Sequence, residues 1–177
     1  MEKRERFSKI IAIFFIIFLI WILLQFSAPL FLPKGSVDNL SGHTLISDNK
    51  EITDAMPFPL NLIYGWGDRL CHQKVERSIH INGNQMPFCS RCTAIWVGLV
   101  IGIGFMIFYK LKLDEKIVIL MLIGIVPLGL DGIGQLAGIW ESNNFIRLIT
   151  GLMMGTVCGI AIGVIIDEFR DIYHHKN

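Results

Sequence analysis

The chain has 177 residues, of which 53% are hydrophobic, and its mean hydropathy of +0.55 is above that of ordinary soluble domains. With 16 basic and 15 acidic side chains the formal charge is +1, so no overall field favours nucleic acid as a partner. Four cysteines are too few for a disulfide-dense scaffold. The apolar residues form long blocks, which is typical of a small polytopic membrane protein.

The first apolar block follows a basic N-terminus and runs from Ile10 to Leu32. At about 1.5 Å per residue, it is long enough to cross a hydrocarbon layer of about 30 Å. A cleaved signal peptide also begins with basic residues, but its apolar region is usually about 7–15 residues long. We therefore expect residues 1–32 to form a retained transmembrane helix.

Residues 33–67 are richer in polar residues, turns and prolines and are predicted to form a polar outer loop. Short β-prone pieces on either side of Ser47-Asp48-Asn49-Lys50 predict a small hairpin over residues 44–53. Apolar residues at helical spacing predict a short interfacial helix that leads into Cys71. These residues are Leu62, Ile63, Trp66 and Leu70.

Three further apolar segments, 93–109, 117–138 and 145–166, are each close to spanning length. Together with a cluster of cysteines and histidines, they form the predicted membrane core over residues 68–166. The last residues, 167–177, form a polar tail. The sequence therefore predicts an all-α polytopic membrane protein with four transmembrane helices.

The positions of lysine and arginine predict the orientation, because cytoplasmic segments carry an excess of both. Positive residues occur at the N-terminus, between residues 110 and 116 and in the tail, whereas the turn at 139–144 has none. We expect both termini in the cytoplasm and the Cys/His cluster on the outer side of the cell membrane. The contrary evidence is three cations in the outer loop: Lys74, Arg77 and Arg91.

Glycines recur every four residues in the last three segments, a spacing that lets helix backbones approach closely in a membrane. The glycines concerned are Gly98 and Gly102, Gly134 and Gly138, and Gly151, Gly155, Gly159 and Gly163. Such faces are also compatible with a homo-oligomer, so the pattern leaves the oligomeric state open.

Three of the four cysteines lie between Cys71 and Cys92. Cys89-Ser90-Arg91-Cys92 is a C-x-x-C motif, which can bind one metal ion or close a disulfide. With Cys71 and His72 it makes a Cys3His set, which is typical of zinc. We therefore predict a zinc site at these four residues.

Several alternatives remain for this cluster. His80, a water molecule or Asp131 can replace His72 as the fourth ligand. A disulfide is the second interpretation, favoured by an oxidising outer side, although three cysteines cannot all pair. Unreactive cysteines are the third. The remaining cysteine, Cys158, lies among glycines in the last apolar segment and is predicted to be a packing residue.

Polar residues also occur inside the predicted spans. Asp131 and Gln135 are four residues apart and so share one helix face, and Arg147 follows the outer turn. An ionisable residue within a span is a candidate functional residue with a partner, which is here Arg147 or Arg91. The alternative is an Asp–Arg pair that only stabilises the bundle.

The sequence resembles the prokaryotic membrane-protein family DUF2085 over about residues 68–165. The resemblance rests on several motifs in order: Cys71-His72-Gln73, Glu76-Arg77-Ser78, Pro87-Phe88-Cys89-Ser90-Arg91-Cys92-Thr93, Asp131-Gly132 with Gln135, and Glu141-Ser142-Asn143-Asn144 with Arg147. It implies a small polytopic membrane protein and brings no established reaction. It also groups Cys71, His72, Cys89, Cys92, Asp131 and Arg147 as one constellation, and favours His72 over His80 as a ligand.

We hypothesise a metal-dependent membrane enzyme that acts on a lipid-linked or amphiphilic anionic substrate, with membrane lipid as its surroundings. The metal would polarise the substrate, Asp131 would carry protons, with Gln135 beside it, and Arg147 or Arg91 would neutralise the anion. Two other functions fit the same residues. One is thiol–disulfide exchange by Cys89 and Cys92, with Cys71 as the cysteine that resolves the mixed disulfide. The other is a non-catalytic subunit or carrier in which the metal only holds the outer loop to the helix bundle.

Overall fold

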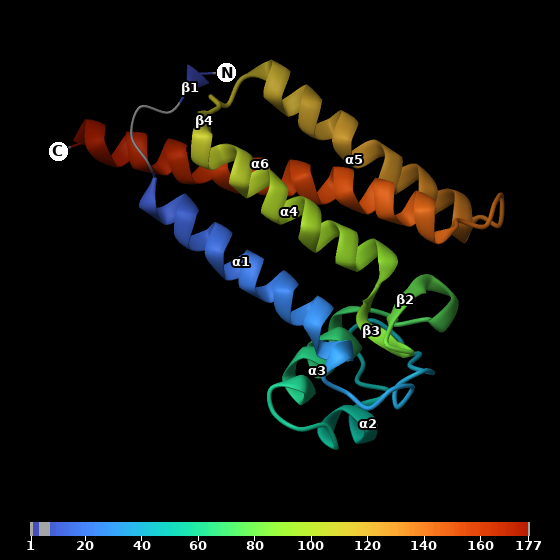
Figure 1. Ribbon diagram of the computed structural model, residues 1–177. Coiled ribbons are helices and arrows are strands. Elements are labelled where there is room, and N and C mark those ends of the chain that lie inside the picture. The colour runs from blue at the N-terminus through green and yellow to red at the C-terminus, as the bar shows by residue number, and fades with distance from the viewer. Residues whose placement is uncertain (1, 4–7, 177) are drawn as a thin grey trace. The chain divides into compact units, whose positions relative to one another are not determined.

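The structure is a computed structural model that describes residues 2–3 and 8–176. Its four long helices are α1 (Lys9–Ser27), α4 (Ser90–Phe108), α5 (Glu115–Leu136) and α6 (Asn144–Lys176) (Figure 1). The shorter helices are η1 (Ala28–Leu30), α2 (Lys50–Asp54), α3 (Leu60–Leu70) and η2 (Val75–Arg77). The strands are β1 (Glu2–Lys3), β2 (Ser78–Ile81), β3 (Asn84–Cys89) and β4 (Tyr109–Lys110).

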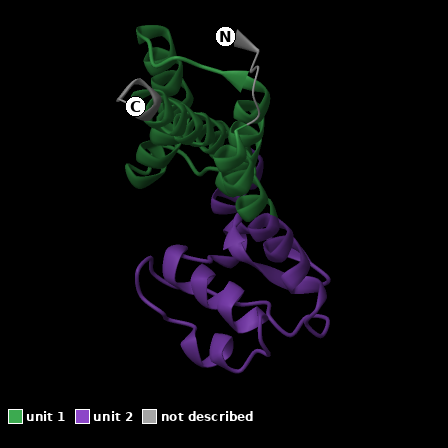
Figure 2. Ribbon diagram, turned by 90° about the vertical axis from the view of Figure 1, so that its left-hand side faces the viewer, with its two compact units in different colours: residues 1–19, 94–142, 146–177 green, residues 20–93, 143–145 purple. Residues whose placement is uncertain are grey.

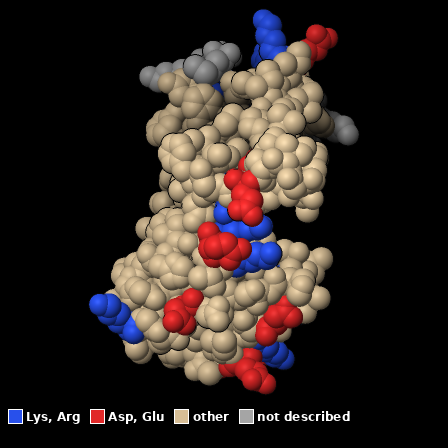
Figure 3. Space-filling model, turned by 90° about the vertical axis from the view of Figure 1, so that its right-hand side faces the viewer, with Lys and Arg blue, Asp and Glu red and all other residues tan. Residues whose placement is uncertain are grey.

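Four helices in the described part of the chain are long and apolar enough to cross a membrane. They span Lys9–Leu30, Ser90–Phe108, Glu115–Leu136 and Asn144–Ile172. On the face shown in Figure 3, most charged side chains gather in the middle and lower part of the view, and the surface above them is largely uncharged. The predicted all-α membrane protein with four transmembrane helices is therefore confirmed, with two short antiparallel sheets added, β1 with β4 and β2 with β3.

The chain divides into two compact units (Figure 2). Unit 1 comprises residues 1–19, 94–142 and 146–177, and unit 2 comprises residues 20–93 and 143–145. Arg4 and Arg6, which contribute to the predicted orientation, lie outside the described residues.

In unit 1, α4 and α6 pack backbone against backbone through their glycines. A Cβ atom at Gly98 would collide with the carbonyl oxygen of Leu152, and one at Gly155 would collide with that of Ile95. Gly102 and Gly159 repeat this contact one turn further along. The predicted close packing of these two helices is confirmed.

The glycines of α5 have a different role from the predicted one. Gly138 follows the helix with a φ of +68°, and the N–H of Ile139 donates to the carbonyl of Gly134 at 2.9 Å. This left-handed residue and its hydrogen bond form a C-terminal helix cap. Gly134 lies against the ring of Trp140. These two glycines therefore end α5 and pack its following turn, and the predicted helix-to-helix contact at this pair is wrong.

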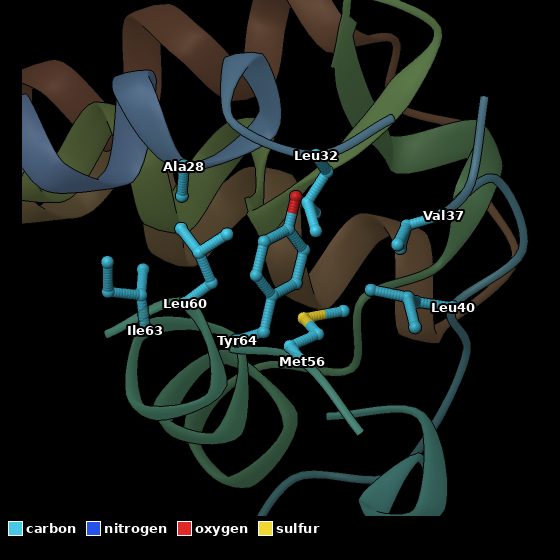
Figure 4. Packing of buried hydrophobic residues seen from close by; sticks show 8 residues of the cluster. All are labelled: Ala28, Leu32, Val37, Leu40, Met56, Leu60, Ile63 and Tyr64. Atoms are coloured by element: carbon cyan, nitrogen blue, oxygen red, sulfur yellow. The ribbon is translucent and has the colours of Figure 1, made fainter. Parts of the chain in front are cut away.

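In unit 2, the main apolar cluster forms around Tyr64 of α3. Its ring is fully buried and lies in the middle of the cluster shown in Figure 4. The phenol donates a hydrogen bond of 2.8 Å to the carbonyl of Gln85, so α3 is joined to β3. The cluster comprises Ala28, Leu32, Val37, Leu40, Met56, Leu60, Ile63 and Tyr64.

Two buried amides on β3 hold the preceding loop. The Asn84 amide accepts from the N–H of Val37 at 3.0 Å and donates to the carbonyl of Pro29 at 2.9 Å. The Gln85 amide accepts from the N–H of Leu40 at 2.9 Å. Buried backbone groups need such partners, and these side chains supply them where the loop has no regular structure.

The predicted hairpin at residues 44–53 is wrong, because α2 occupies Lys50–Asp54. The backbone and side-chain nitrogens of Asn49 donate to the buried Asp68 carboxylate at 2.8 to 3.2 Å. This contact ties the start of α2 to α3 and leaves no strand partner. A hairpin forms instead between β2 and β3, where Asn82 and Gly83 both have positive φ, as a type I′ turn requires.

The predicted short helix before Cys71 is confirmed as α3. Leu62, Trp66 and Leu70 are exposed along one side of it. The Trp66 ring also meets the Trp21 ring of α1 at a centroid distance of 6.4 Å. Within unit 2, α3 therefore packs against a membrane-spanning helix.

Candidate metal centre

Three cysteines from three elements meet in unit 2. Cys71 follows α3 in an extended conformation, Cys89 is the last residue of β3, and Cys92 lies in the first turn of α4. Their sulfur atoms all lie within 4.8 Å of one another. The predicted grouping of these three residues is thus present in the structure.

Local packing explains why Cys89 lies next to Cys71, although the two are 18 residues apart. Gln73 has a φ of +44°, and its amide donates to the carbonyl of Pro87 at 2.8 Å. A Cβ atom at Gly67 would collide with the same carbonyl. The hydroxyl of Ser90 donates to the carbonyl of Arg77 at 2.9 Å. These contacts place the end of β3 against the end of α3.

The cluster is almost closed to solvent. Cys71 is 1% exposed and Cys89 is 2% exposed, whereas Cys92 is half-buried. Phe88 and Trp21 pack against it, with their rings edge to face at a centroid distance of 6.1 Å. An apolar cover of this kind keeps competing ligands away from the sulfurs and strengthens their electrostatic interactions.

Hydrogen bonds concentrate negative charge on Cys89. Its pKa is lowered by hydrogen bonds from the Cys71 and Cys92 thiols, and further by one from His72 and by the backbone N–H of Cys92. The pKa of Cys71 is raised to about 11, chiefly because its thiol donates to Cys89. These hydrogen bonds favour the thiolate at Cys89 over that at Cys71, and a thiolate is the form that binds metals and attacks disulfides.

The fourth ligand is less well defined. His72 is half-buried beside the cluster, and its Nδ1 accepts a hydrogen bond from the backbone N–H of Lys74 at 3.2 Å. His80 lies on β2 opposite Gln85 and is exposed. Neither belongs to the group of ligand atoms within 4.8 Å. The prediction of His72 as the fourth ligand stays a prediction.

The other predicted site residues are divided between the units. Asp131 is 4% exposed in α5 of unit 1, where its carboxylate accepts from the Ser142 hydroxyl at 3.0 Å and from the Trp140 Nε1 at 3.4 Å. Gln135 is half-buried and Arg147 is 5% exposed, both in unit 1. Arg91 belongs to unit 2. A common pocket for these residues and the cysteines stays a prediction.

Several residues that support the cluster were not predicted. They are Trp21, Gln73, Asn84, Gln85 and Phe88, all in unit 2. The Asn82-Gly83 dipeptide is a strong hairpin signal and would have predicted the strand that carries Cys89. No short sequence pattern predicts that Trp21, which is 50 residues from Cys71, covers the sulfurs.

Comparisons with known proteins agree with the membrane assignment. A family model described as a predicted membrane protein (DUF2085) matches residues 71–161. An uncharacterized protein of Methanothermobacter thermautotrophicus is 38% identical over 93 residues, which are 52% of this chain and 82% of the relative. An uncharacterized protein of Methanocaldococcus jannaschii is 33% identical over 150 residues, 84% of this chain and 86% of the relative. No solved structure matches the chain.

Proposed function

This chain belongs to the DUF2085 family of predicted membrane proteins, and we propose that it is a zinc protein whose metal is held by Cys71, Cys89 and Cys92. His72 is the proposed fourth ligand. The observation that carries the proposal is the meeting of three sulfurs within 4.8 Å from three separate elements.

The donor set fits zinc. Zinc binds thiolates at about 2.3 Å, so the sulfurs of a tetrahedral site lie about 3.8 Å apart. Sulfurs within 4.8 Å of one another reach that spacing with small side-chain adjustments. The lowered pKa of Cys89, which is due first to its hydrogen bond from Cys71, favours a thiolate there before metal binds. A bound cation would stabilise the other two thiolates in the same way.

The proposed site joins the end of α3, the end of β3 and the start of α4. Because the unfolded chain lacks such a site, metal binding favours the folded arrangement of these elements. Bound zinc supplies a Lewis acid at this position. Cys71 and Cys89 fix the ligand geometry in the buried interior, and the half-buried Cys92 and His72 are on the more accessible side.

An enzymatic role is the further part of the proposal. The substrate would be lipid-linked or amphiphilic and anionic, with Asp131 carrying protons and Arg147 or Arg91 neutralising the anion. Support comes from the burial of Asp131 and Arg147 in membrane-spanning helices, where ionisable residues are costly and commonly functional. Lipid profiles of a deletion strain test it: an accumulated lipid should disappear on complementation with the wild type and persist with Asp131→Asn. No lipid difference between the strains would contradict this part.

Thiol–disulfide exchange is the second candidate, favoured by the lowered pKa of Cys89, the residue immediately before α4. The Cys89 thiolate would attack one sulfur of a substrate disulfide, which breaks the substrate S–S bond, releases a first substrate thiolate and forms a mixed disulfide. Cys71, after losing its proton to solvent, would then resolve this mixed disulfide by displacing the second substrate thiolate, so that two electrons pass to the substrate. Cys92 would displace Cys71 from the resulting Cys71–Cys89 disulfide, and a Cys89–Cys92 disulfide would remain. This function predicts a disulfide that follows the applied redox potential and no stoichiometric zinc.

Single substitutions identify the ligands. We expect Cys71→Ser, Cys89→Ser and Cys92→Ser each to reduce zinc per chain severely, whereas Cys158→Ser keeps it. His72→Ala should weaken zinc binding about tenfold or more, while the exposed His80→Ala should not. If the three variants of the cluster cysteines retain zinc, the proposed site is contradicted. If His72→Ala and His80→Ala weaken zinc binding equally, only the assignment of His72 as the fourth ligand is contradicted.

The proposed topology has both termini in the cytoplasm and the cysteine cluster on the outer side of the cell membrane. It is supported by Lys110, Lys112 and Lys116 in the connection between α4 and α5, and by the absence of lysine and arginine between residues 139 and 144. Reporter fusions after residues 112 and 141 test it. The fusion after residue 112 should be active only with a reporter that works in the cytoplasm, and the fusion after residue 141 only with one that works on the outer side. The opposite pattern would contradict the topology.

A further inference from the structure

A cavity of about 530 Å³ lies among the helices of unit 1, beside the connection from α4 to α5. Three membrane-spanning helices supply apolar wall residues: Phe105 from α4, Leu120 from α5 and Ile160 from α6. The cavity therefore has a wall that suits hydrocarbon, at the ends of α4 and α5 where the chain leaves the membrane.

The rim of this cavity is basic. Lys110, Lys112 and Lys116 line it, and Asp114 is the one carboxylate among the lining residues. Asp114 is already used as the N-cap of α5, where it accepts from the N–H of Ile117 at 2.9 Å. The lining residues thus carry a net positive charge.

Two of the three lysines remain available to a ligand. The Lys110 ammonium is paired with Asp171 of α6, and the N–H of Leu113 donates to the Glu168 carboxylate at 3.4 Å. These contacts hold the connection against α6. Lys112 and Lys116 are exposed, and within the described residues neither takes part in an ion pair.

We propose that this cavity binds an anionic phospholipid, with Lys112 and Lys116 on the headgroup phosphate and an acyl chain against the apolar wall. Lysine binds phosphate as a compact point charge, and basic pockets between membrane helices are suited to acidic headgroups. A soluble phosphate would satisfy the rim but leave the wall of Phe105, Leu120 and Ile160 without a partner. The site is separate from the cysteine cluster and does not depend on metal.

Native mass spectrometry of the full chain in detergent tests this site. Phosphatidylglycerol and phosphatidylcholine with identical acyl chains would be added in equal amounts. We expect phosphatidylglycerol to bind in preference, and Lys112→Gln with Lys116→Gln to reduce that preference about tenfold or more. Lys112→Arg with Lys116→Arg keeps both charges and should keep the preference.

The matched control removes two lysines from unit 2, by Lys34→Gln with Lys50→Gln, and should leave the preference unchanged. Equal binding of the two lipids by the wild type would overturn the proposal. The proposal would also be overturned if Lys112→Gln with Lys116→Gln left the preference for phosphatidylglycerol unchanged, or if the control variant lost that preference to the same extent. Displacement of the lipid by inorganic phosphate would overturn the lipid assignment in favour of a soluble anion.

Discussion

The sulfur of Cys71 accepts a hydrogen bond from the backbone N–H of Cys89 over 3.3 Å. The two residues are 18 positions apart, and the bond joins the end of α3 to the end of β3. Backbone N–H groups aimed at a sulfur stabilise its thiolate. This bond favours a negative sulfur at Cys71, as a metal site requires, but the hydrogen bond that the Cys71 thiol donates to Cys89 outweighs it, so the net pKa of Cys71 is raised.

The thiol group of Cys89 should react at lower pH than those of ordinary cysteines. The pKa of Cys89 is lowered, first by the hydrogen bond from Cys71, whereas the pKa of Cys71 is raised to about 11. After chelation, alkylation of Cys89 by iodoacetamide should persist to lower pH than that of Cys71, which reacts only as pH rises toward its own pKa. Peptide mass spectrometry measures both rates.

Replacing Cys71, the hydrogen-bond donor, tests what lowers the pKa of Cys89. Cys71→Ala removes the largest stabilising hydrogen bond, so the pKa of Cys89 should rise and its alkylation should slow below pH 7. An unchanged pH profile in this variant would show that Cys71 does not stabilise the thiolate.

Tyr64 should make unit 2 sensitive to alkaline pH. Burial raises the pKa of its phenol above the ordinary value of about 10. The raised pKa means that this contribution to stability is complete below pH 10 and is lost as pH rises beyond it. Tyr64→Phe also removes the 2.8 Å hydrogen bond to Gln85, at a cost of about 1–2 kcal/mol.

Thermal unfolding of the wild type and Tyr64→Phe between pH 8 and 11 measures both effects. The variant should have the lower Tm at pH 8, and its Tm should decline less above pH 10. Parallel decline of the two proteins would contradict the linkage to Tyr64.

Glycine packing between α4 and α6 should be sensitive to a single methyl group. Gly98→Ala places a Cβ against the carbonyl of Leu152 and should destabilise the protein by about 1–3 kcal/mol. Gly129→Ala is the matched control in α5, because nothing lies within 4 Å of its Cβ position. That change should be neutral or stabilising by up to about 1 kcal/mol. Unfolding in detergent measures both, and equal effects would contradict the close contact.

Asp131 should stabilise the turn after α5. Asp131→Asn directs an amide group toward the Ser142 hydroxyl and the Trp140 Nε1, which both donate to the carboxylate, so we expect a loss of about 1–3 kcal/mol. Ser142→Ala should lose less. Tm measurements compare the two variants, and a fully stable Asp131→Asn protein would contradict a structural role for the carboxylate.

The membrane helices were predictable because their signal is local. A run such as Ile10 to Leu32 needs no distant partner to be recognised as a span. The C-x-x-C motif likewise predicted that Cys89 and Cys92 lie close together, because a turn or the first turn of a helix brings residues three apart to one side. Gly98 and Gly102 predicted a packing face for the same reason.

The supports of the site were not predictable, because they depend on contacts between distant segments. Asn84 and Gln85 are polar and yet fully buried, since their partners are backbone groups between Pro29 and Leu40. The strand that contains them therefore lacks the alternation of a half-buried strand. Similarly, the local pattern around Asn49 predicts a hairpin, whereas the contact of Asn49 with the distant Asp68 places it at the start of α2.

The most direct test of the zinc site is the metal content per chain of detergent-purified protein, with a count of free thiols on the same sample. We predict about one zinc per chain, with Cys71, Cys89 and Cys92 protected from alkylation until a chelator is added. Absence of metal, together with two thiols that appear only after reduction, would contradict the zinc site and favour disulfide chemistry instead.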